Sequence, residues 1–334
     1  MKILAFETSC DDTSIALFEN EVLICMHTKS QIKIHNLTGW VVPEVASREH
    51  ANVIFDVLAH VLSEANTELR DIDYIAVTTH PGLVPSLLTG ITVASTLSET
   101  LQIPILPIDH IQAHIFSNFL ERKESQISFP LVCLTVSGWH NEVYYMSDMW
   151  TRVKLGQTQD DAAGEAFDKV AKMMWLEYPG WPIISNLASQ FTQEWKNLFP
   201  RVFLEKSAFW FSFSGLKSAV KREVDKRGVL TQDDKIELSF EFQSAVNEVL
   251  SYKLIEAAQQ KWVSTVMLAG WVSANDDLNQ RIQSSSQKLW LKFYAPVKKL
   301  YCMDNAAMIG ILAYYKIKYW EFEHHIGSVE VGKW

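Results

Sequence analysis

Two stretches far apart in the chain repeat one pattern: a buried strand, a turn of small or polar residues, and a strand that returns. In the second stretch an apolar run begins at Leu131 and stops at Ser137-Gly138, and the returning strand is expected from Val143 to Met146. At the start of the chain, Ile3 to Phe6 is such a run and Ser14 to Phe18 returns after the turn. A strand that ends in small residues exposes backbone N–H groups, which can cradle a phosphate.

A third strand is expected after each hairpin, over residues 22–27 and 152–156, and each set then leads into helical sequence. A three-strand unit that occurs twice predicts a duplicated α/β fold of two lobes, with the ligand in the cleft between them. The length of 334 residues is sufficient for two such lobes.

The rest of the chain gives simpler expectations. Residues 31–42 are expected to form a loop, a helix is expected after Pro43, and another is expected from Leu87 to Leu101. Thr231 and Asp233 are expected to cap a long helix whose leucines, valine and phenylalanine repeat every four residues. The last helix is expected over residues 306–318.

Composition excludes several classes of protein. Hydrophobic residues make up 48% and charged residues 21%, the balance of an ordinary globular protein. No apolar run is long enough to cross a bilayer and no secretory signal precedes the first strand, so the sequence predicts a cytoplasmic protein with no membrane partner. The four cysteines form no Cys-x-x-Cys pair, which favours free thiols over a zinc site of four thiolates.

The net charge of −9 gives no global attraction to nucleic acid, so any RNA contact needs a local patch or the charge of a partner. The best candidate patch is basic and helical. It consists of Lys217, Lys221, Arg222, Lys226 and Arg227. A solvated helix face is the simpler interpretation of these five residues.

His110 and His114 are four residues apart on an expected helix, so both imidazoles lie on one face, where they can bind one metal ion. Ile111 stands where the zinc-protease motif needs a glutamate, which excludes that pattern. The best third ligand is Asp304. Packing or surface histidines, and an Asp304 that merely caps a helix, are the alternative interpretations.

Several polar residues near the small-residue turns can position a phosphate-bearing ligand or its metal, or can serve only as caps and turn residues. They are Asp11, Asp12, Asp160, Asp161 and Asp168. Asn275, which follows a third small-residue turn, can hydrogen-bond a sugar or a base. No Walker loop or dinucleotide-binding glycine pattern is present.

Seven motifs occur in an order that resembles one family. They are Phe6-Glu7-Thr8-Ser9-Cys10-Asp11-Asp12-Thr13, Val42-Pro43-Glu44-Val45-Ala46-Ser47-Arg48, His110-Ile111-Gln112-Ala113-His114, residues 160–169, Phe211-Ser212-Phe213-Ser214-Gly215-Leu216-Lys217, Val272-Ser273-Ala274-Asn275 and Asp304-Asn305-Ala306-Ala307-Met308. Together they resemble the tRNA adenosine threonylcarbamoyltransferases, over nearly the whole chain.

The resemblance implies an actin-like/Hsp70-like/sugar-kinase fold. It assigns a first lobe to residues 1–105, with residues from about 305 to 334 packing back on it. It assigns the second lobe, with most of the nucleotide and metal site, to residues 106–304. The implied activity is an acyltransferase reaction that modifies tRNA: threonylcarbamoyl moves from threonylcarbamoyl-AMP to N6 of adenosine 37 in tRNAs that read ANN codons.

The resemblance also implies site residues and partners. His110, His114 and Asp304 would hold one Fe²⁺, or alternatively Zn²⁺, per chain. The adenylate would bind to Thr135, Val136, Ser137, Gly138, Trp139, Asp168, Trp181 and Asn275. No general base is identified, and Ser9 and Asp11 are the catalytic candidates. The implied partners are tRNA, an inactive paralogue subunit, a small ATPase and a synthase that makes the adenylate.

Two rival functions remain. A catalytically inert family member could act as a scaffold in the tRNA-modifying complex, but a scaffold has no need of metal ligands. An ATP-dependent small-molecule kinase of the same fold is disfavoured by the same metal site.

The chain departs from the family at glycine positions, where it has tryptophan. The affected residues are Trp40, Trp139, Trp175, Trp181 and Trp271. An indole in the phosphate turn would fill the space that the ligand needs and forbid the backbone conformations that glycine allows. A paralogue that has lost its activity is one interpretation, although random decay would introduce many residue types.

The other interpretation is that the gene reads UGA as glycine and was translated with UGA as tryptophan. The chain has 13 glycines where roughly 23 are usual, and its 12 tryptophans would bring the total to 25. Trp150, Trp262, Trp290 and Trp320 also occupy plausible turn sites, while the sequence does not decide whether Trp195, Trp210 and Trp334 belong with them.

Overall fold

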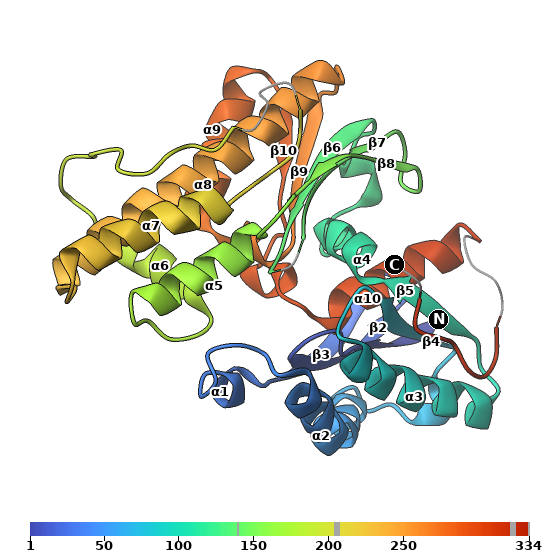
Figure 1. Ribbon diagram of the computed structural model, residues 1–334. Coiled ribbons are helices and arrows are strands. Elements are labelled where there is room, and N and C mark those ends of the chain that lie inside the picture. Colours follow the sequence, from blue (N-terminus) through green and yellow to red (C-terminus); the bar gives the residue numbers. More distant parts are fainter. Residues whose placement is uncertain (139, 204–207, 321–324, 333–334) are drawn as a thin grey trace. The chain divides into compact units, whose positions relative to one another are not determined.

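The structure is a computed structural model that describes residues 1–138, 140–203, 208–320 and 325–332. The chain divides into two compact units, Met1–Gln126 with Pro296–Trp334, and Ile127–Ala295. Each unit contains a five-stranded mixed sheet with helices packed on it (Figure 1).

The sheet of the first unit has the order β3-β2-β1-β4-β5. Its strands are β1 (Lys2–Glu7), β2 (Asp12–Glu19), β3 (Val22–Ser30), β4 (Tyr74–His80) and β5 (Ile105–Asp109). The first three strands are antiparallel neighbours, and β4 and β5 extend the sheet in parallel with β1. The hairpin register places Phe6 opposite Ile15.

The sheet of the second unit repeats this topology with the order β8-β7-β6-β9-β10. Its strands are β6 (Leu131–Val136), β7 (Asn141–Met146), β8 (Arg152–Gln157), β9 (Thr265–Ala269) and β10 (Lys292–Tyr294). Again the first three are antiparallel and the last two are parallel to the first. The predicted duplication and fold class are therefore confirmed, whereas the ligand cleft between the lobes stays a prediction.

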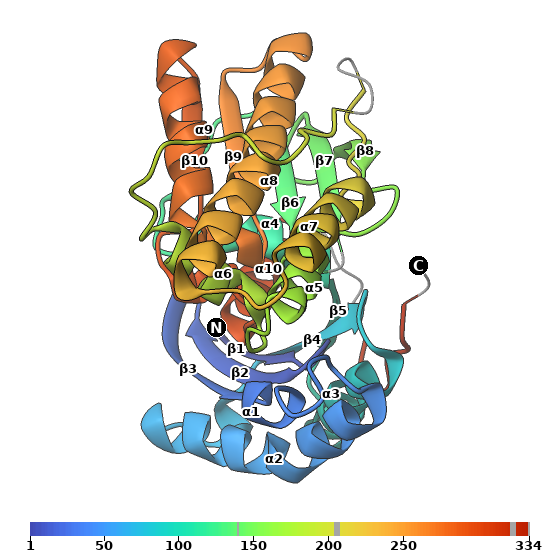
Figure 2. The same cartoon turned by 60° about the vertical axis from the view of Figure 1, so that its left-hand side comes forward.

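The helices of the first unit cover both faces of its sheet, α2 and α3 on one face and α10 on the other (Figures 1 and 2). They are α1 (Ile32–His35), α2 (Pro43–Glu64), α3 (Val84–Leu101), α4 (His110–Phe116) and α10 (Ala306–Lys318), with short 3₁₀ turns at Leu69–Asp71, Ser117–Phe119, Glu124–Gln126 and Lys299–Cys302. Successive side chains of β2 point to opposite faces of the sheet, so this strand contacts the helices on both sides. Leu17 joins the core under α2 and α3, while the ring of Phe18 lies against Gly310 of α10.

The boundary of the first unit differs from the sequence expectation. Residues 106–126 and 296–304 belong to this unit and not to the second, because α4 packs on α10 and α10 packs on β1 and β2. The last helix, α10, packs on the sheet of the first unit. The short helix α1 also replaces part of the expected loop, since Asn36 and Gly39 N–H groups donate to carbonyls one turn earlier.

The second unit holds its core between the sheet and a helical layer. Its helices are α5 (Ala163–Met173), α6 (Gly180–Ala188), α7 (Ser214–Arg227), α8 (Gln232–Gln260) and α9 (Asp276–Lys288), with a 3₁₀ turn, η4, at Trp271–Ala274. The ring of Phe167 meets that of Phe242 edge-on, at 5.0 Å between centroids, in this core. Helix α8 begins with a capping box of Thr231 and Asp234, so Asp234 takes the role expected of Asp233.

Among the described residues, no helix combines the length and apolar character that a membrane crossing requires. All four cysteines are free thiols, as predicted.

Candidate active site

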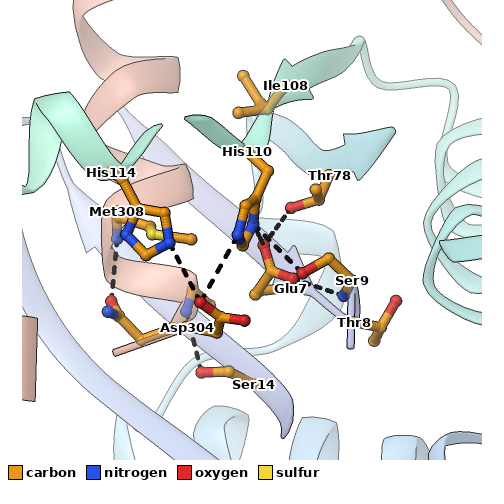
Figure 3. Close-up of polar contacts among 12 residues, drawn as sticks. Glu7, Thr8, Ser9, Ser14, Thr78, Ile108, His110, His114, Asp304 and Met308 are labelled. Carbon is orange, nitrogen blue, oxygen red and sulfur yellow. Dashed lines mark hydrogen bonds and ion pairs between the residues drawn. The ribbon is translucent and has the colours of Figure 1, made fainter. Parts of the chain in front are cut away.

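Helix α4 presents the two histidines of the candidate metal centre one turn apart. The helix starts directly at the end of β5, where the Asp109 carboxylate accepts the N–H groups of Ile111 and Gln112 at 2.8 and 3.0 Å. This cap fixes the first turn, so that His110 and His114 project from the same side (Figure 3).

Asp304 faces both imidazoles from the start of α10. Its Oδ1 atom lies 3.1 Å from His114 Nε2 and 3.6 Å from His110 Nε2, and one donor atom from each of the three residues falls within 4.8 Å of the others (Figure 3). The helix cap is the next residue, Asn305, which accepts the N–H of Met308 at 3.1 Å. The alternative that Asp304 is only a helix cap is therefore excluded.

A buried carboxylate that the sequence analysis did not single out orients the first histidine. Glu7 Oε2 lies 3.1 Å from His110 Nδ1 and accepts the hydroxyl of Thr78 at 2.6 Å, while Glu7 Oε1 accepts the N–H of Ser9 at 2.6 Å. This arrangement turns His110 Nε2 toward Asp304, as carboxylate partners do for metal-bound histidines. The signal was present in the sequence, because Glu7 lies within the first family motif.

The electrostatics of the cluster favour a cation. Burial lowers the pKa of His110, but the negative charges of Glu7 and Asp304 outweigh it and raise that pKa to about 9. Burial lowers the pKa of His114, which keeps this ring neutral. Two imidazoles and a carboxylate are a donor set suited to Fe²⁺ or Zn²⁺, so the residues present fit such an ion.

The two catalytic candidates lie beside this cluster. Ser9 is buried, and its hydroxyl is 3.2 Å from His110 Nδ1. Asp11 is partly buried, and its carbonyl accepts the N–H of Gln31 at 3.0 Å. Nothing in this geometry assigns either residue a proton-transfer step, and both remain candidates.

The buried carboxylate of Asp12 should make the stability of the fold depend on pH. Burial and the charge of Asp11 raise the pKa of Asp12 to about 8, and its buried Oδ1 has no hydrogen-bond partner among the described residues. Because the folded state holds this proton more tightly than the unfolded chain, the residue destabilises the fold as pH rises from about 4 to 8. We expect Asp12→Asn to raise the free energy of unfolding by about 1–3 kcal/mol at pH 8 and to change it little at pH 4, measured by urea titration.

The control for this prediction is Asp148→Asn. Hydrogen bonds from the N–H groups of Thr151 and Trp150 lower the pKa of Asp148 to about 2. Its contribution has the opposite sign, being present above about pH 4 and lost as pH falls toward 2, so this variant loses stability at neutral pH. Equal responses of the two variants to pH would contradict the assignment for Asp12.

In the second unit, the predicted turn follows β6. The side chains of Thr135 and Val136 are buried in the sheet, so only backbone groups can meet a ligand there. The Ser137 N–H donates to the carbonyl of His140 at 2.7 Å, and the Ser137 hydroxyl accepts the His140 N–H at 3.1 Å. Trp139 lies outside the described residues.

Two other residues that were expected to bind the adenylate make hydrogen bonds within the protein. Asp168 accepts the N–H of Gly180 at 2.7 Å and so holds the first turn of α6. The Asn275 amide is buried, accepts the N–H of Leu278 at 3.0 Å, and donates to Gln243 at 2.8 Å. Their roles in adenylate binding stay predictions.

Asp160 and Asp161 lie just before helix α5 and make their contacts with other parts of the second unit. Helix α5 begins only at Ala163, because Asp160 instead accepts the N–H groups of Phe213 and Ser214 at the start of α7. Asp161 pairs with Lys169 and Lys217. The contacts of Asp160 are those of a helix cap, whereas the Asp161 carboxylate is held in ion pairs.

Trp271 lies against the turn after β6. A Cβ atom on Gly138 would be 3.3 Å from Trp271 Nε1, and one on Gly164 would be 2.5 Å from Trp271 Cζ2. The ring of Trp181 is 5.6 Å from that of Trp271, and its buried Nε1 has no hydrogen-bond partner among the described residues. Trp271 thus occupies the space beside Gly138, and the ring of Trp181 packs against it.

The basic patch on α7 is largely neutralised. Lys217 pairs with Asp161, Lys221 with Asp225, Lys226 with Glu223, and Arg227 with Glu223, Asp234 and Glu237. A helix face whose cations are paired within the chain agrees with the solvated-face interpretation and offers little charge to RNA.

Solved structures with the same architecture define the class. HypF in its phosphate- and nucleotide-bound form has a TM-score of 0.63 at 12% identity, covering 95% of this chain and 46% of that one. The activator of 2-hydroxyisocaproyl-CoA dehydratase from Clostridium difficile with bound ADPNP has a TM-score of 0.56 at 12% identity, covering 97% and 99%. The chain is thus a duplicated actin-like α/β protein with a His-His-Asp group that could hold a metal ion.

Sequence relatives make the assignment specific. The family model described as tRNA N6-adenosine threonylcarbamoyltransferase matches residues 22–311. The protein of that name from Thermodesulfovibrio yellowstonii is 44% identical over 320 residues, 95% of this chain and 94% of its own length. The one from Staphylococcus saprophyticus is 42% identical, covering 95% and 91%. The chain belongs to the tRNA N6-adenosine threonylcarbamoyltransferase family, which confirms the resemblance.

Proposed function

We propose that this chain transfers threonylcarbamoyl from threonylcarbamoyl-AMP to N6 of adenosine 37 in tRNAs that read ANN codons. The observation that carries the proposal is the cluster of His110, His114 and Asp304 in a member of this family. In the reaction the bond from the carbamoyl carbon to the phosphate oxygen breaks, and a bond from that carbon to N6 forms. AMP leaves, and N6 loses one proton.

The chemistry explains why such a site is needed. An exocyclic adenine amine is a poor nucleophile, so the carbamoyl carbon must be held in line with it and made more electrophilic. An ion held by His110, His114 and Asp304 would supply Lewis acidity and a fixed template. Glu7 and Thr78 keep the first imidazole in place, and backbone N–H groups after β6 would bind the leaving phosphate.

The proposed cofactor is Fe²⁺, one per chain, with Zn²⁺ as the alternative, because both accept imidazole and carboxylate donors. We propose tRNA, an inactive paralogue subunit and a small ATPase as the partners. An RNA-binding partner would supply positive charge that the paired cations of α7 do not. The free thiols fit a reducing compartment, which supports a cytoplasmic reaction.

Acceptor identity tests this function directly. The chain, with its partner proteins and Fe²⁺, is incubated with threonylcarbamoyl-AMP labelled in the threonine and an ANN-decoding tRNA. The same tRNA with guanosine at position 37 is the control. Label in the adenosine tRNA alone supports the proposal, whereas equal label in both, or in neither, contradicts it.

Replacement of the orienting carboxylate gives a prediction about the metal itself. Glu7→Gln keeps the size of the side chain but removes the charge beside His110. We expect metal affinity to fall by roughly 10–100-fold, the usual cost of losing such a partner, measured by competition with a chromogenic chelator.

The matched control is Glu241→Gln in the second unit. Glu241 is also a buried carboxylate, and it accepts the N–H groups of residues 196–198 and the indole of Trp195. This variant should lower thermal stability without changing metal affinity. If Glu7→Gln bound metal as tightly as the unchanged chain, the orienting role would be refuted.

A further inference from the structure

Four of the tryptophans adopt a backbone conformation that suits glycine. The φ angles of Trp175, Trp262, Trp290 and Trp320 are 57°, 54°, 58° and 59°. This left-handed region costs little for glycine, is tolerated by asparagine, and is a true outlier for a bulky side chain. Of the nine non-glycine residues described with positive φ, three are asparagines and four are these tryptophans.

All four occupy the same position relative to a helix. Each lies within two residues of the end of its helix: α5 ends at Met173, α8 at Gln260, α9 at Lys288 and α10 at Lys318. Three of these tryptophans are each followed by a residue whose N–H group donates to the carbonyl five residues before it, in the last turn of the helix. These bonds run from Leu176 to Ala171 (2.9 Å), from Val263 to Ala258 (3.1 Å) and from Leu291 to Ser286 (2.9 Å).

This N–H to carbonyl bond is characteristic of the Schellman motif at the C-terminal end of a helix. In that motif glycine is strongly favoured at the residue with positive φ, and an apolar residue follows it directly. Leu176, Val263 and Leu291 supply that apolar residue. Helix α2 ends with the same bond, from Thr67 to Leu62 (3.0 Å), and has an asparagine, Asn66, at a φ of 47° in this place. The local sequence therefore contains the whole motif except the glycine.

Burial gives no reason for an indole at these sites. The four side chains are 86%, 93%, 92% and 77% exposed, in the order of the sequence. A tryptophan normally stabilises the folded state by burying the large apolar surface of its ring. Here it takes an unfavourable backbone conformation and leaves most of its apolar surface in water.

Trp195 shows what a tryptophan that belongs to this fold looks like. Its indole N–H donates to Glu241 at 3.1 Å, its ring meets Phe240 edge-on at 6.2 Å, and the guanidinium of Arg201 lies 5.2 Å above it. Its φ is not positive. The structure thus separates Trp195 from the four other tryptophans by backbone angle and by exposure, which is 47% for Trp195 against 77–93% for the four.

We infer that residues 175, 262, 290 and 320 are glycine in the natural protein, encoded by UGA, whereas residue 195 is tryptophan, encoded by UGG. A single reassigned codon explains why the substitutions share one residue type and one backbone geometry. The family resemblance already places a glycine at position 175 but says nothing of the other three positions, and the backbone angles carry the inference for all four without it. The inference is equally independent of the proposed function.

The test compares codons with peptide masses. The gene is read at the five positions, and the protein purified from its natural source is digested and its peptides are weighed. Glycine masses at the four positions, UGA codons there, and an intact tryptophan with UGG at position 195 are the expected result. An indole at any of the four positions, or glycine at position 195, overturns the inference.

A stability measurement checks the role of backbone strain by a separate route. Recombinant chain with all four tryptophans changed to glycine should melt higher than the chain as written, by roughly 2–4 °C for each position relieved of strain. Trp195→Gly is the matched control and should melt lower. A fourfold variant that melts no higher than the chain as written would overturn the assignment of strain to these positions.

Discussion

Removal of the Asp304 carboxylate should abolish both metal binding and transfer. We expect Asp304→Ala to lower metal affinity and the rate of transfer by more than about a hundredfold. Loss of a residue that only hydrogen-bonds a metal ligand already lowers metal affinity or activity by about 10–100-fold, and the loss of a ligand itself should cost more. The side chain is partly exposed, and the helix cap is Asn305, so the fold should survive. Metal content is measured by mass spectrometry of the purified protein, and the transfer rate with labelled adenylate.

Asp233→Ala is the control for this variant. Asp233 is an exposed carboxylate in the first turn of α8, so its removal changes charge by the same amount away from the centre. Both activities should persist in the control. An Asp304→Ala protein that retains its metal and transfers normally would remove this residue from the site.

The second large effect concerns the indoles beside the turn after β6. We expect the double variant Trp181→Gly/Trp271→Gly to bind the adenylate about tenfold more tightly or better, which corresponds to about 1.4 kcal/mol. The physical reason is that the Trp271 ring lies over Gly138 and Gly164, where a phosphate would approach the backbone N–H groups. Affinity is measured by calorimetry with a non-hydrolysable analogue of the adenylate.

The double variant Trp175→Gly/Trp262→Gly removes the same number of indoles from sites away from this turn. It should melt higher, because both backbone angles favour glycine, and its affinity for the analogue should not change. A gain in affinity of the same size in both double variants would mean that the space beside Gly138 is not what limits binding.

The sequence was sufficient for the architecture because apolar runs and turns are local signals. The twin hairpins at Phe6 and Val136 predicted the duplication, and both sheets have it. The unit boundary was missed because it depends on a long-range contact, the packing of α4 on α10, which no local pattern records.

The candidate site was predictable in part for the same reason. The spacing of His110 and His114 fixes a shared helix face, whereas the position of Asp304 relative to them required the fold. Glu7 received no role in the sequence analysis, because a carboxylate at the end of a strand gains meaning only from its contact with His110. The contacts of Asp160 were not predictable from its neighbours in the sequence, because its partners lie far along the chain at the start of α7.

Formation of threonylcarbamoyladenosine in tRNA distinguishes a transferase from a scaffold most directly. The chain with every tryptophan except Trp195 changed to glycine is combined with the partner proteins, Fe²⁺, threonylcarbamoyl-AMP and an ANN-decoding tRNA, and the digested tRNA is weighed for threonylcarbamoyladenosine. A transferase forms the modified nucleoside at position 37, and forms none when Asp304 is also changed to Ala. A folded, metal-bound chain that forms none of it with Asp304 intact would contradict the transferase function and favour the scaffold.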